Sequence, residues 1–341
     1  MLAKLSLLPL LSAAVSASPL LDVRAPVAAL DERAVTVSSA DLSNFEYYVQ
    51  MVAATSCNSE AAAGASITCS ADACPDVTAN GGKIVGTFSF SGLVSGLQGF
   101  VATDPVRKNI VIAIRGSSNV RNWITNILFG FDDCDFVDGC KVHTGFANGW
   151  DEIKDALLAS VKSAKAANPS YTIVGTGHSL GGAVVTIAAA DLRRDGYPVD
   201  IYTYGSPRVG NAAFTNFVTA QAGAEYRVTH VDDPVPRLPP ILFGYRHTSP
   251  EYWLSTGNAT TVDYAVADIK VCEGAANTKC NGGTFGLDVD AHLYYLRRTG
   301  ACSTDGFGIK EREEDISDED LAARLTAWAQ QDIEYAASLE E

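Results

Sequence analysis

The chain has 341 residues, of which 47% are hydrophobic and 19% charged, a balance typical of a globular protein with a substantial core. Its formal net charge of −15 argues against nucleic acid or an anionic membrane as an electrostatic partner. The negative charge is concentrated near the end of the chain, where residues 309–341 hold eleven Asp and Glu against three Lys and Arg.

Residues 1–17 have the pattern of a secretory signal peptide. Lys4 supplies a basic start, residues 5–15 are apolar, and small residues follow at the expected cleavage site. A membrane anchor needs about 20 apolar residues, and no segment reaches that length. Residues 18–33 contain charged residues and proline and end in LDER, and we interpret them as a propeptide. We therefore expect a soluble protein that is secreted to the extracellular space and has no transmembrane anchor.

The cysteines predict disulfide bonds rather than a metal site. An even number of cysteines behind a signal peptide indicates four disulfides, and no pair has the spacing of a zinc site. Their spacing alone leaves the pairing open. The eight are Cys57, Cys69, Cys74, Cys134, Cys140, Cys272, Cys280 and Cys302. The sequon Asn258-Ala259-Thr260 predicts N-glycosylation at Asn258, which agrees with export.

Apolar strands alternate with amphipathic helices through the middle of the chain. The predicted strands cover residues 108–116, 171–177, 199–205 and 225–231. In the segments between these strands, apolar residues recur at the spacing of an amphipathic helix, and Asn168-Pro169 ends the first of these predicted helices. This alternation predicts an α/β fold with a mainly parallel central sheet covered by helices on both faces. Functional groups of such a sheet gather at the carboxyl ends of its strands.

Ser179 lies at one of these strand ends. The sequence Gly177-His178-Ser179-Leu180-Gly181 matches the pattern G-x-S-x-G between a predicted strand and a predicted helix. A sharp turn there exposes the serine hydroxyl, and the N–H of Leu180 points to where an oxyanion would form. The alternative is a glycine-rich turn with a capping serine, but the strand-to-helix context favours a nucleophile.

A nucleophilic serine needs a base and an acid that orients the base. In this motif's fold the chain order is serine, acid, histidine. Asp232 and Asp233 follow the strand of residues 225–231, and spacing hardly separates them. His247 and His292 remain as bases, and position favours His292 because it lies late enough to fold back over the site.

The loop after the first strand offers a second oxyanion donor and a short apolar helix. Ser117 directly follows that strand and can contribute its N–H. The helix begins near Val120, and without further context it could equally be an ordinary core helix. Its apolar residues are Val120, Trp123, Ile124, Ile127 and Leu128.

Five segments of the chain are RGSSNVRNWITN, GHSLGGA, TYGSPRVGN, VTHVDDPVPRLPP and FGYRHTSPEYW, in that order. Together they resemble the secreted fungal class 3 triacylglycerol lipases, over about residues 35–302. The resemblance implies an α/β-hydrolase fold with a lid helix over the active site. It also implies Ser179 as nucleophile, Asp233 rather than Asp232 as acid, His292 as base, and Ser117 and Leu180 as oxyanion-hole donors.

The same resemblance assigns the short helix and the cysteines. It makes residues 120–127 the lid, with Trp123 as its aromatic residue. Trp123, Ile124, Ile127 and Leu128 are then expected to cover an acyl groove, and Arg121, Asn122 and Asn126 to face water. The family pairs Cys57 with Cys302, Cys69 with Cys74 and Cys134 with Cys140, which leaves Cys272 with Cys280.

The expected function is that of a secreted serine ester hydrolase. It would hydrolyse triacylglycerols to fatty acids and di- or monoacylglycerols through an acyl-enzyme on Ser179, with lid opening at a lipid–water interface. Neither a metal nor a cofactor is expected. The alternatives are a feruloyl or other carboxyl esterase or a phospholipase on the same fold and, from another class, an inactive lipid-binding protein.

The chain continues after the region that resembles this family. We expect a lipase domain at residues 34–302 and an acidic extension at residues 303–341. Ser317 and Asp320 resemble a capping box that begins a helix, and Asp332 interrupts the helix's apolar stripe. The stripe comprises Leu321, Leu325, Trp328, Tyr335 and Leu339. We favour a solvated or loosely docked appendage over the alternative, a helix that docks on the lid or contacts lipid.

Overall fold

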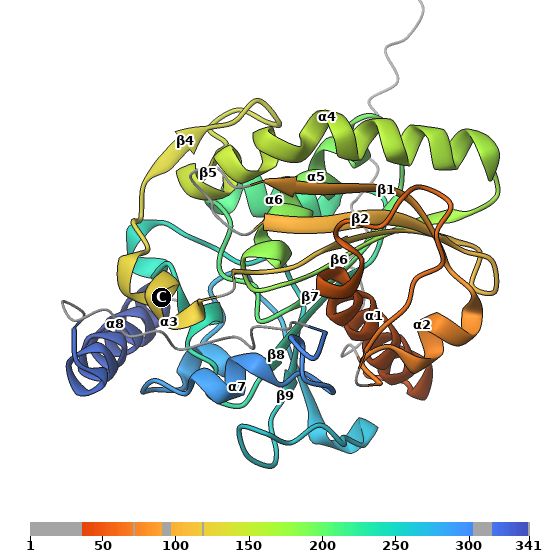
Figure 1. Ribbon diagram of the computed structural model, residues 1–341. Coiled ribbons are helices and arrows are strands. Elements are labelled where there is room, and N and C mark those ends of the chain that lie inside the picture. The colour runs from red at the N-terminus through yellow and green to blue at the C-terminus, as the bar shows by residue number, and fades with distance from the viewer. Residues whose placement is uncertain (1–35, 71, 91–96, 118, 303–315, 340–341) are drawn as a thin grey trace, which may run out of the picture. The chain divides into compact units, whose positions relative to one another are not determined.

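The computed structural model describes residues 36–339 except residues 71, 91–96, 118 and 303–315 (Figure 1). The predicted signal peptide and propeptide lie outside the described residues. Apart from these gaps, the structure describes residues 36–302 of the expected lipase domain and most of the expected extension.

A mainly parallel sheet forms the centre of the described chain, as the sequence predicts. Its strand order is β1-β2-β3-β6-β7-β8-β9-β10. The pairs from β3 to β9 are parallel, whereas β1, β2 and β10 add antiparallel strands at the two edges. The strands are β1 (Lys83–Phe90), β2 (Leu97–Asp104), β3 (Asn109–Ile114), β6 (Thr172–His178), β7 (Val199–Tyr204), β8 (Glu225–His230), β9 (Glu251–Leu254) and β10 (Ile269–Cys272).

Helices cover both faces of the sheet (Figure 1). One face carries α4 (Thr144–Ala167), α5 (Leu180–Arg194) and α6 (Ala212–Ala220), and the other carries α1 (Ser39–Asn58) and α2 (Pro75–Asn80). Every residue of β3 is buried between these layers, which agrees with its continuously apolar sequence from Ile110 to Ile114. The predicted helical spacing also holds in α4, where Ile153, Leu157 and Val161 are buried.

Short elements surround the carboxyl ends of the strands. They are α3 (Val120–Asn126), α7 (Val289–Leu293), the 3-10 helices η1 (Val235–Arg237), η2 (Ile241–Phe243), η3 (Val266–Asp268) and η4 (Asn281–Gly283), and the hairpin of β4 (Phe131–Asp133) and β5 (Lys141–His143). The helix α8 (Asp318–Leu339) completes the described chain.

Four disulfide bonds join the cysteines in the pairs that the family resemblance implies. Cys57–Cys302 connects α1 to the last described residue before the extension, 245 positions along the chain. The other three bridges are local, with sequence separations of 5, 6 and 8. The long bridge therefore restricts the unfolded chain much more than the local ones do.

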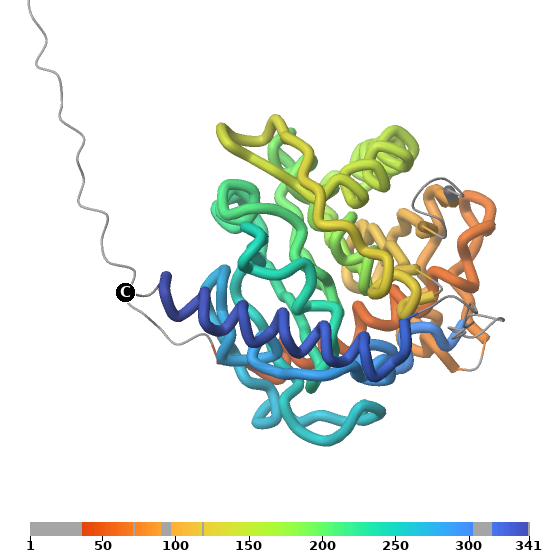
Figure 2. Tube along the Cα trace, turned by 90° about the vertical axis from the view of Figure 1, so that its left-hand side faces the viewer, coloured from red at the N-terminus to blue at the C-terminus, as the bar shows by residue number. Residues whose placement is uncertain are grey.

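The extension forms the predicted helix, but this helix is not a solvated or loosely docked appendage. Ser317 and Asp320 form the expected cap, with the N–H of Asp320 donating to Ser317 Oγ at 3.1 Å. Figure 2 shows α8 lying across the face of the molecule that it shares with the segment around α3. Its buried residues are Leu321, Leu325, Ala329, Asp332 and Ala336.

Asp332 anchors α8 rather than interrupting its packing. It is buried, and its Oδ2 lies 2.9 Å from Arg208 Nη1 and accepts a hydrogen bond of the same length from the N–H of Ile241. Its Oδ1 accepts from the N–H of Leu242 at 3.0 Å. A buried carboxylate needs such partners, and they come from segments far away in the sequence, so the helical pattern alone could not predict them.

Candidate active site

The turn at Ser179 is as sharp as its glycines suggest. Ser179 joins β6 to α5 with φ 55° and ψ −130°, a strained conformation for a residue with a side chain. A Cβ at Gly177 would lie 2.3 Å from the carbonyl oxygen of Gly181, and a Cβ at Gly181 would lie 2.2 Å from that of Ile114. The helix therefore packs this close to β3 and β6 only because both positions are glycine.

Asp233 and His292 form a buried pair. Asp233 follows β8 and His292 lies in α7, yet His292 Nδ1 is 2.8 Å from Asp233 Oδ2 and both side chains are fully buried. The N–H of Val235 donates to the other carboxylate oxygen, Oδ1, at 2.8 Å. The carboxylate is thus held at both oxygens, in the arrangement that orients an imidazole in a serine hydrolase.

Asp232 and His247, the alternative acid and base, do not take part in this pair. The structure pairs Asp233 rather than Asp232 with His292. His247 is buried with Nε2 at 2.7 Å from the carbonyl oxygen of Pro236, and burial lowers its pKa well below the usual value. A neutral histidine with a main-chain partner is a structural residue here.

His178 places His292 beside the nucleophile. The Nε2 of His178 lies 2.7 Å from the carbonyl oxygen of His292, and the centroids of the two rings are 4.4 Å apart. Burial lowers the pKa of His178 well below its usual value, so its ring is neutral. His292 Nε2 is buried and has no hydrogen-bond partner among the described residues, Ser179 included. Such catalytic contacts are commonly long without substrate and tighten in the complex.

The expected oxyanion donors adjoin Ser179. A Cβ at Gly116 would lie 2.7 Å from the Cβ of Ser179, so the segment after β3 rests against the nucleophile. Ser117 comes next in the chain, and its Oγ accepts from the N–H of Asn119 at 3.3 Å. Leu180 is the first residue of α5, where main-chain N–H groups lack partners within the helix.

The expected lid helix α3 lies over an apolar wall next to the acid and the base. Val120 and Ile124 are buried against Val235, Leu238 and Leu293. Val235 is two residues after Asp233 and Leu293 directly follows His292. The apolar cluster that includes α3 therefore contains residues that closely follow the acid and the base in the chain.

The other residues of the predicted lid are not all buried or exposed as expected. Trp123 is half-buried and stacks on Phe146 of α4, with ring centroids 6.4 Å apart, and Ile127 is also half-buried. Leu128 was expected to cover the groove, but it is 81% exposed because α3 ends before it. Asn126 is exposed, as expected, and Asn122 is half-buried.

Arg121 was expected to face water, and that expectation is wrong. Its side chain is buried, with Nε 2.7 Å from Asp318 Oδ1 and Nη2 donating to the carbonyl oxygen of Ile316 at 2.7 Å. The reason is that α8 and the residues before it lie against the outward side of α3. The lid helix alone gives no sign of this second layer.

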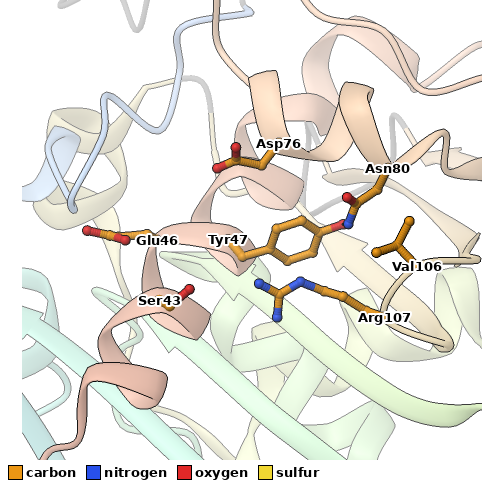
Figure 3. Close-up of a pocket in the computed structure, with 7 residues that line it drawn as sticks. All are labelled: Ser43, Glu46, Tyr47, Asp76, Asn80, Val106 and Arg107. Atoms are coloured by element: carbon orange, nitrogen blue, oxygen red, sulfur yellow. The ribbon is translucent and has the colours of Figure 1, made fainter.

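A cavity lies away from this constellation (Figure 3). It has a volume of about 450 Å³, and Arg107 lies over the Tyr47 ring at 3.8 Å from the centroid. Its lining residues are Ser43, Glu46, Tyr47, Asp76, Asn80, Val106 and Arg107. Burial, with the charges of Asp76 and Asp263, raises the pKa of Glu46. None of the expected catalytic residues lines it.

The structure gives no set of ligands for a metal in the part of the chain it describes. The sulfurs of Cys57, Cys69 and Cys302 lie within 4.8 Å of one another, but all three are in disulfide bonds. Asn258, the expected glycosylation site, lies in an exposed loop with its Oδ1 accepting from the N–H of Thr260 at 3.0 Å.

Comparison with known proteins decides the family. A family model described as Lipase (class 3) matches residues 111–243. A secreted mono- and diacylglycerol lipase of Fusarium solani is 53% identical over 331 residues, 97% of each chain. The chain belongs to the class 3 lipases. A secreted mono- and diacylglycerol lipase of Penicillium cyclopium is 41% identical over 281 residues, which cover 80% of this lipase and 90% of that one.

Solved structures of fungal lipases agree with this fold. A mutant of the Penicillium cyclopium enzyme and a mono- and diacylglycerol lipase from Aspergillus oryzae each match with a TM-score of 0.73 and 39% identity. Each is matched over its whole length and covers 78% of this chain. The α/β-hydrolase fold is thereby confirmed, and this class 3 lipase is an enzyme that hydrolyses acylglycerol esters.

The relatives also bear on location. The Fusarium and Penicillium enzymes are named as secreted lipases. Within residues 36–339, apart from the gaps, no helix is both long and apolar enough to cross a membrane.

Proposed function

We propose that this lipase hydrolyses acylglycerols through an acyl-enzyme on Ser179, with His292 as base and Asp233 as orienting acid. The observation that carries the proposal is the buried Asp233–His292 hydrogen bond of 2.8 Å, which lies beside a strained serine at the end of β6. Each residue type is the one that this chemistry requires.

In the proposed mechanism each group has one role. His292 Nε2 takes the proton of the Ser179 hydroxyl as the serine oxygen attacks the ester carbonyl. The N–H groups of Ser117 and Leu180 bind the oxyanion, while Asp233 holds the protonated ring in place. His292 then gives its proton to the leaving glyceride oxygen, and the ester bond breaks. Water, deprotonated by His292, attacks the acyl-enzyme. His292 returns this proton to Ser179 Oγ as the bond to the acyl group breaks, and the fatty acid is released.

We infer that the substrates are acylglycerols, with mono- and diacylglycerols prominent among them. The relatives from Fusarium and Penicillium are named for those two substrates. The wall of Val235, Leu238 and Leu293 beside the acid and base suits an acyl chain better than a polar feruloyl ester. Rates on mono-, di- and triacylglycerols, phosphatidylcholine and a feruloyl ester would rank the substrates.

Access to this wall requires two helices to move. Leu321 and Leu325 of α8 pack in the same cluster as Val120 and Ile124 of α3. Arg324 Nη2 also donates to the carbonyl oxygen of Thr125 in α3 at 3.2 Å. We therefore extend the lid to include α8: opening α3 toward lipid breaks its contacts with the extension. Exposed apolar surface costs about 25 cal/mol per Å², which keeps both helices closed in water.

The face around α8 is the surface that we propose for lipid contact. Among the described residues, the large apolar side chains more than two-fifths exposed are Val106, Leu128, Val137, Leu242, Phe243, Phe285 and Leu339. Leu339 lies on α8, and Leu242 and Phe243 lie in η2, whose N–H groups bind Asp332. Leu128 and Phe285 each precede a residue that contacts α8. The ring centroid of Phe129 lies 5.2 Å from that of Trp328 in α8 and 5.5 Å from that of Phe243. The N–H of Gly286 donates a hydrogen bond to Thr326 of α8.

This lipid-contact face fits an uncharged lipid surface better than an anionic one, because the chain carries a net charge of −15 and α8 begins with three acidic residues. We further propose that the enzyme acts outside the cell, after loss of residues 1–17 and 18–33. Its lipase domain is then residues 34–302 and its extension residues 303–341.

The test that separates an enzyme from an inactive lipid-binding protein is Ser179→Ala. If the proposal is right, this variant binds an acylglycerol emulsion as the parent does but releases no fatty acid. Hydrolysis by Ser179→Ala at the parent rate would overturn the proposed mechanism.

A further inference from the structure

Tyr295 contacts the same carboxylate oxygen as the base does. It lies three residues after His292, just beyond α7, and is fully buried. Its hydroxyl donates a hydrogen bond to Asp233 Oδ2, the oxygen that also lies 2.8 Å from His292 Nδ1. Since Oδ1 is held by the N–H of Val235, the carboxylate is fixed in orientation through both of its oxygens.

Three aromatic rings enclose Tyr295. The ring centroids of His178, Tyr204 and His230 lie 5.8, 6.1 and 5.6 Å from its own, all close to edge-to-face. This enclosure leaves the Tyr295 side chain one position, so its hydroxyl is aimed at Asp233 before any substrate arrives.

Main-chain atoms also pack against the junction at which the Asp233 carboxylate, the His292 ring and the Tyr295 hydroxyl meet. Gly205 follows β7 with φ 57°, and a Cβ there would lie 2.8 Å from Asp233 Oδ2, 2.9 Å from His292 Nδ1 and 2.9 Å from the Tyr295 hydroxyl oxygen. A side chain at Gly205 would thus displace all three atoms. The main chain of Gly205 closes this side of the junction.

The hydroxyl remains a donor under working conditions. Burial, with the negative charge of Asp233, raises the pKa of Tyr295 well above its usual value, so the group stays protonated. A second donor on Oδ2 restrains rotation of the carboxylate and draws negative charge from the oxygen that faces the imidazole.

We propose that Tyr295 is a positioning residue for catalysis: its hydroxyl locks the Asp233 carboxylate against His292 and limits how strongly that carboxylate favours the protonated ring. This inference rests on the proposed roles of Asp233 and His292. It predicts an effect on turnover and on the pH dependence of the rate, beyond any effect on stability.

Other groups near the junction stay in place when the hydroxyl is removed. His178 and His230 are buried, which lowers the pKa of each. Arg237 and Asp232 lie close enough to interact electrostatically with this region, as does Glu251 with Tyr295 itself. Tyr295→Phe changes none of these charges, so a shifted pH profile reports the lost hydrogen bond.

The experiment measures kcat and KM for a dissolved short-chain ester from pH 5 to 9 in Tyr295→Phe. Active sites are counted by labelling Ser179 with a fluorophosphonate, so that partial misfolding does not lower the rate per site. We expect a loss of about tenfold in kcat with KM little changed, the size of one hydrogen bond to a charged group. The acid limb of the profile should move to higher pH, because the carboxylate with one donor fewer favours the protonated ring more strongly.

Tyr204→Phe is the matched control. Tyr204 is equally buried, and its hydroxyl donates to a main-chain carbonyl, that of Phe45, at 2.7 Å. This variant should lose stability but keep the parent's kcat per site and pH profile. A parental kcat and profile in Tyr295→Phe, or the same changes in both variants, would overturn the inference.

A double variant separates this inference from the proposed function. In an Asp233→Asn background, Tyr295→Phe should cause no further loss of kcat, because its effect acts through the carboxylate. An active Asp233→Asn enzyme would contradict the proposed function itself. An inactive one, with Tyr295→Phe in the parent behaving like the parent, would contradict only the role of Tyr295.

Discussion

At Asp233 the sequence and the structure contribute different information. Asp232 and Asp233 stand side by side before Pro234, and no spacing rule separates them. Only the fold brings α7 to the end of β8 and so places His292 Nδ1 at 2.8 Å from Asp233 rather than from Asp232. The two carboxylates differ in which of them lies next to His292, 59 residues after Asp233, and only the tertiary structure decides this.

Substitution at these two aspartates tests the acid assignment. Asp233→Asn should lower kcat by about 10⁴-fold, because the amide favours the wrong tautomer of His292. Asp232→Asn serves as the control and should retain most of the activity. Both are assayed on a dissolved short-chain ester with the folded fraction checked by circular dichroism. Loss of activity in Asp232→Asn alone would show that the acid is misassigned.

Asp332 is a residue whose role depends on a buried partner. It pairs with Arg208 and accepts two main-chain N–H groups. Asp332→Ala would leave the Arg208 guanidinium buried without its carboxylate, which costs about 3–5 kcal/mol when a buried pair is broken. Thermal unfolding should therefore begin at a lower temperature, or α8 should become sensitive to protease.

Glu334→Ala is the control for Asp332→Ala, since Glu334 lies on the exposed side of the same helix. It should leave both thermal unfolding and proteolysis of α8 unchanged. Equal stability of the Asp332→Ala variant and the parent in both measurements would mean that the buried pair does not anchor the helix.

At the scale of elements, long periodic segments were predictable and contacts between them were not. The strand predicted at residues 171–177 is β6, and the helix predicted after Ser179 is α5, because the apolar pattern of a segment indicates which of its side chains are buried. Arg121 was misjudged because a helix pattern shows which side is polar, not what covers that side. A polar side can face water or another helix, and here it faces the carboxylate of Asp318.

The contact between α3 and α8 predicts how the lid responds to mutation. Leu321 is fully buried in the cluster that joins the two helices, and Leu321→Ala should cost about 2–5 kcal/mol of that packing. The closed state then loses stability relative to the open one. Activity on a dissolved ester, relative to activity on an emulsion, should rise about tenfold or more.

Gln331→Ala provides the comparison on the same helix, because Gln331 is exposed and lies outside the cluster that joins α3 and α8. It should preserve the parent's steep rise in rate once a short-chain triglyceride exceeds its solubility. If Leu321→Ala also preserves this rise and the parent's ratio of rates, α8 does not hold the lid closed.

At the scale of the whole molecule, catalysis and lipid contact are proposed for the same side. The carboxyl ends of the strands position Ser179, α3 and α8 cover the apolar wall next to it, and most of the exposed large apolar side chains adjoin α8. Composition predicted an acidic tail but not this arrangement, because a charge count does not show which residues of an acidic helix point inward. The exposure of Leu242 and Phe243 in η2 was likewise not predictable from the sequence, because so short a segment has no periodic pattern of apolar residues.

The lipid-contact face can be tested separately from catalysis by using the Ser179→Ala background, in which the lipid stays intact. The double variant Leu242→Ser and Phe243→Ser removes two exposed apolar side chains from η2. Flotation with triacylglycerol emulsions stabilised by phosphatidylcholine should show binding weaker by about tenfold or more, since each lost side chain removes about 1 kcal/mol of transfer energy. Val106→Ser is the control, because Val106 is 66% exposed but borders the distant cavity of Figure 3. Equal weakening in both variants would reject a localised lipid-contact face, and unchanged binding in the double variant would move that face away from η2.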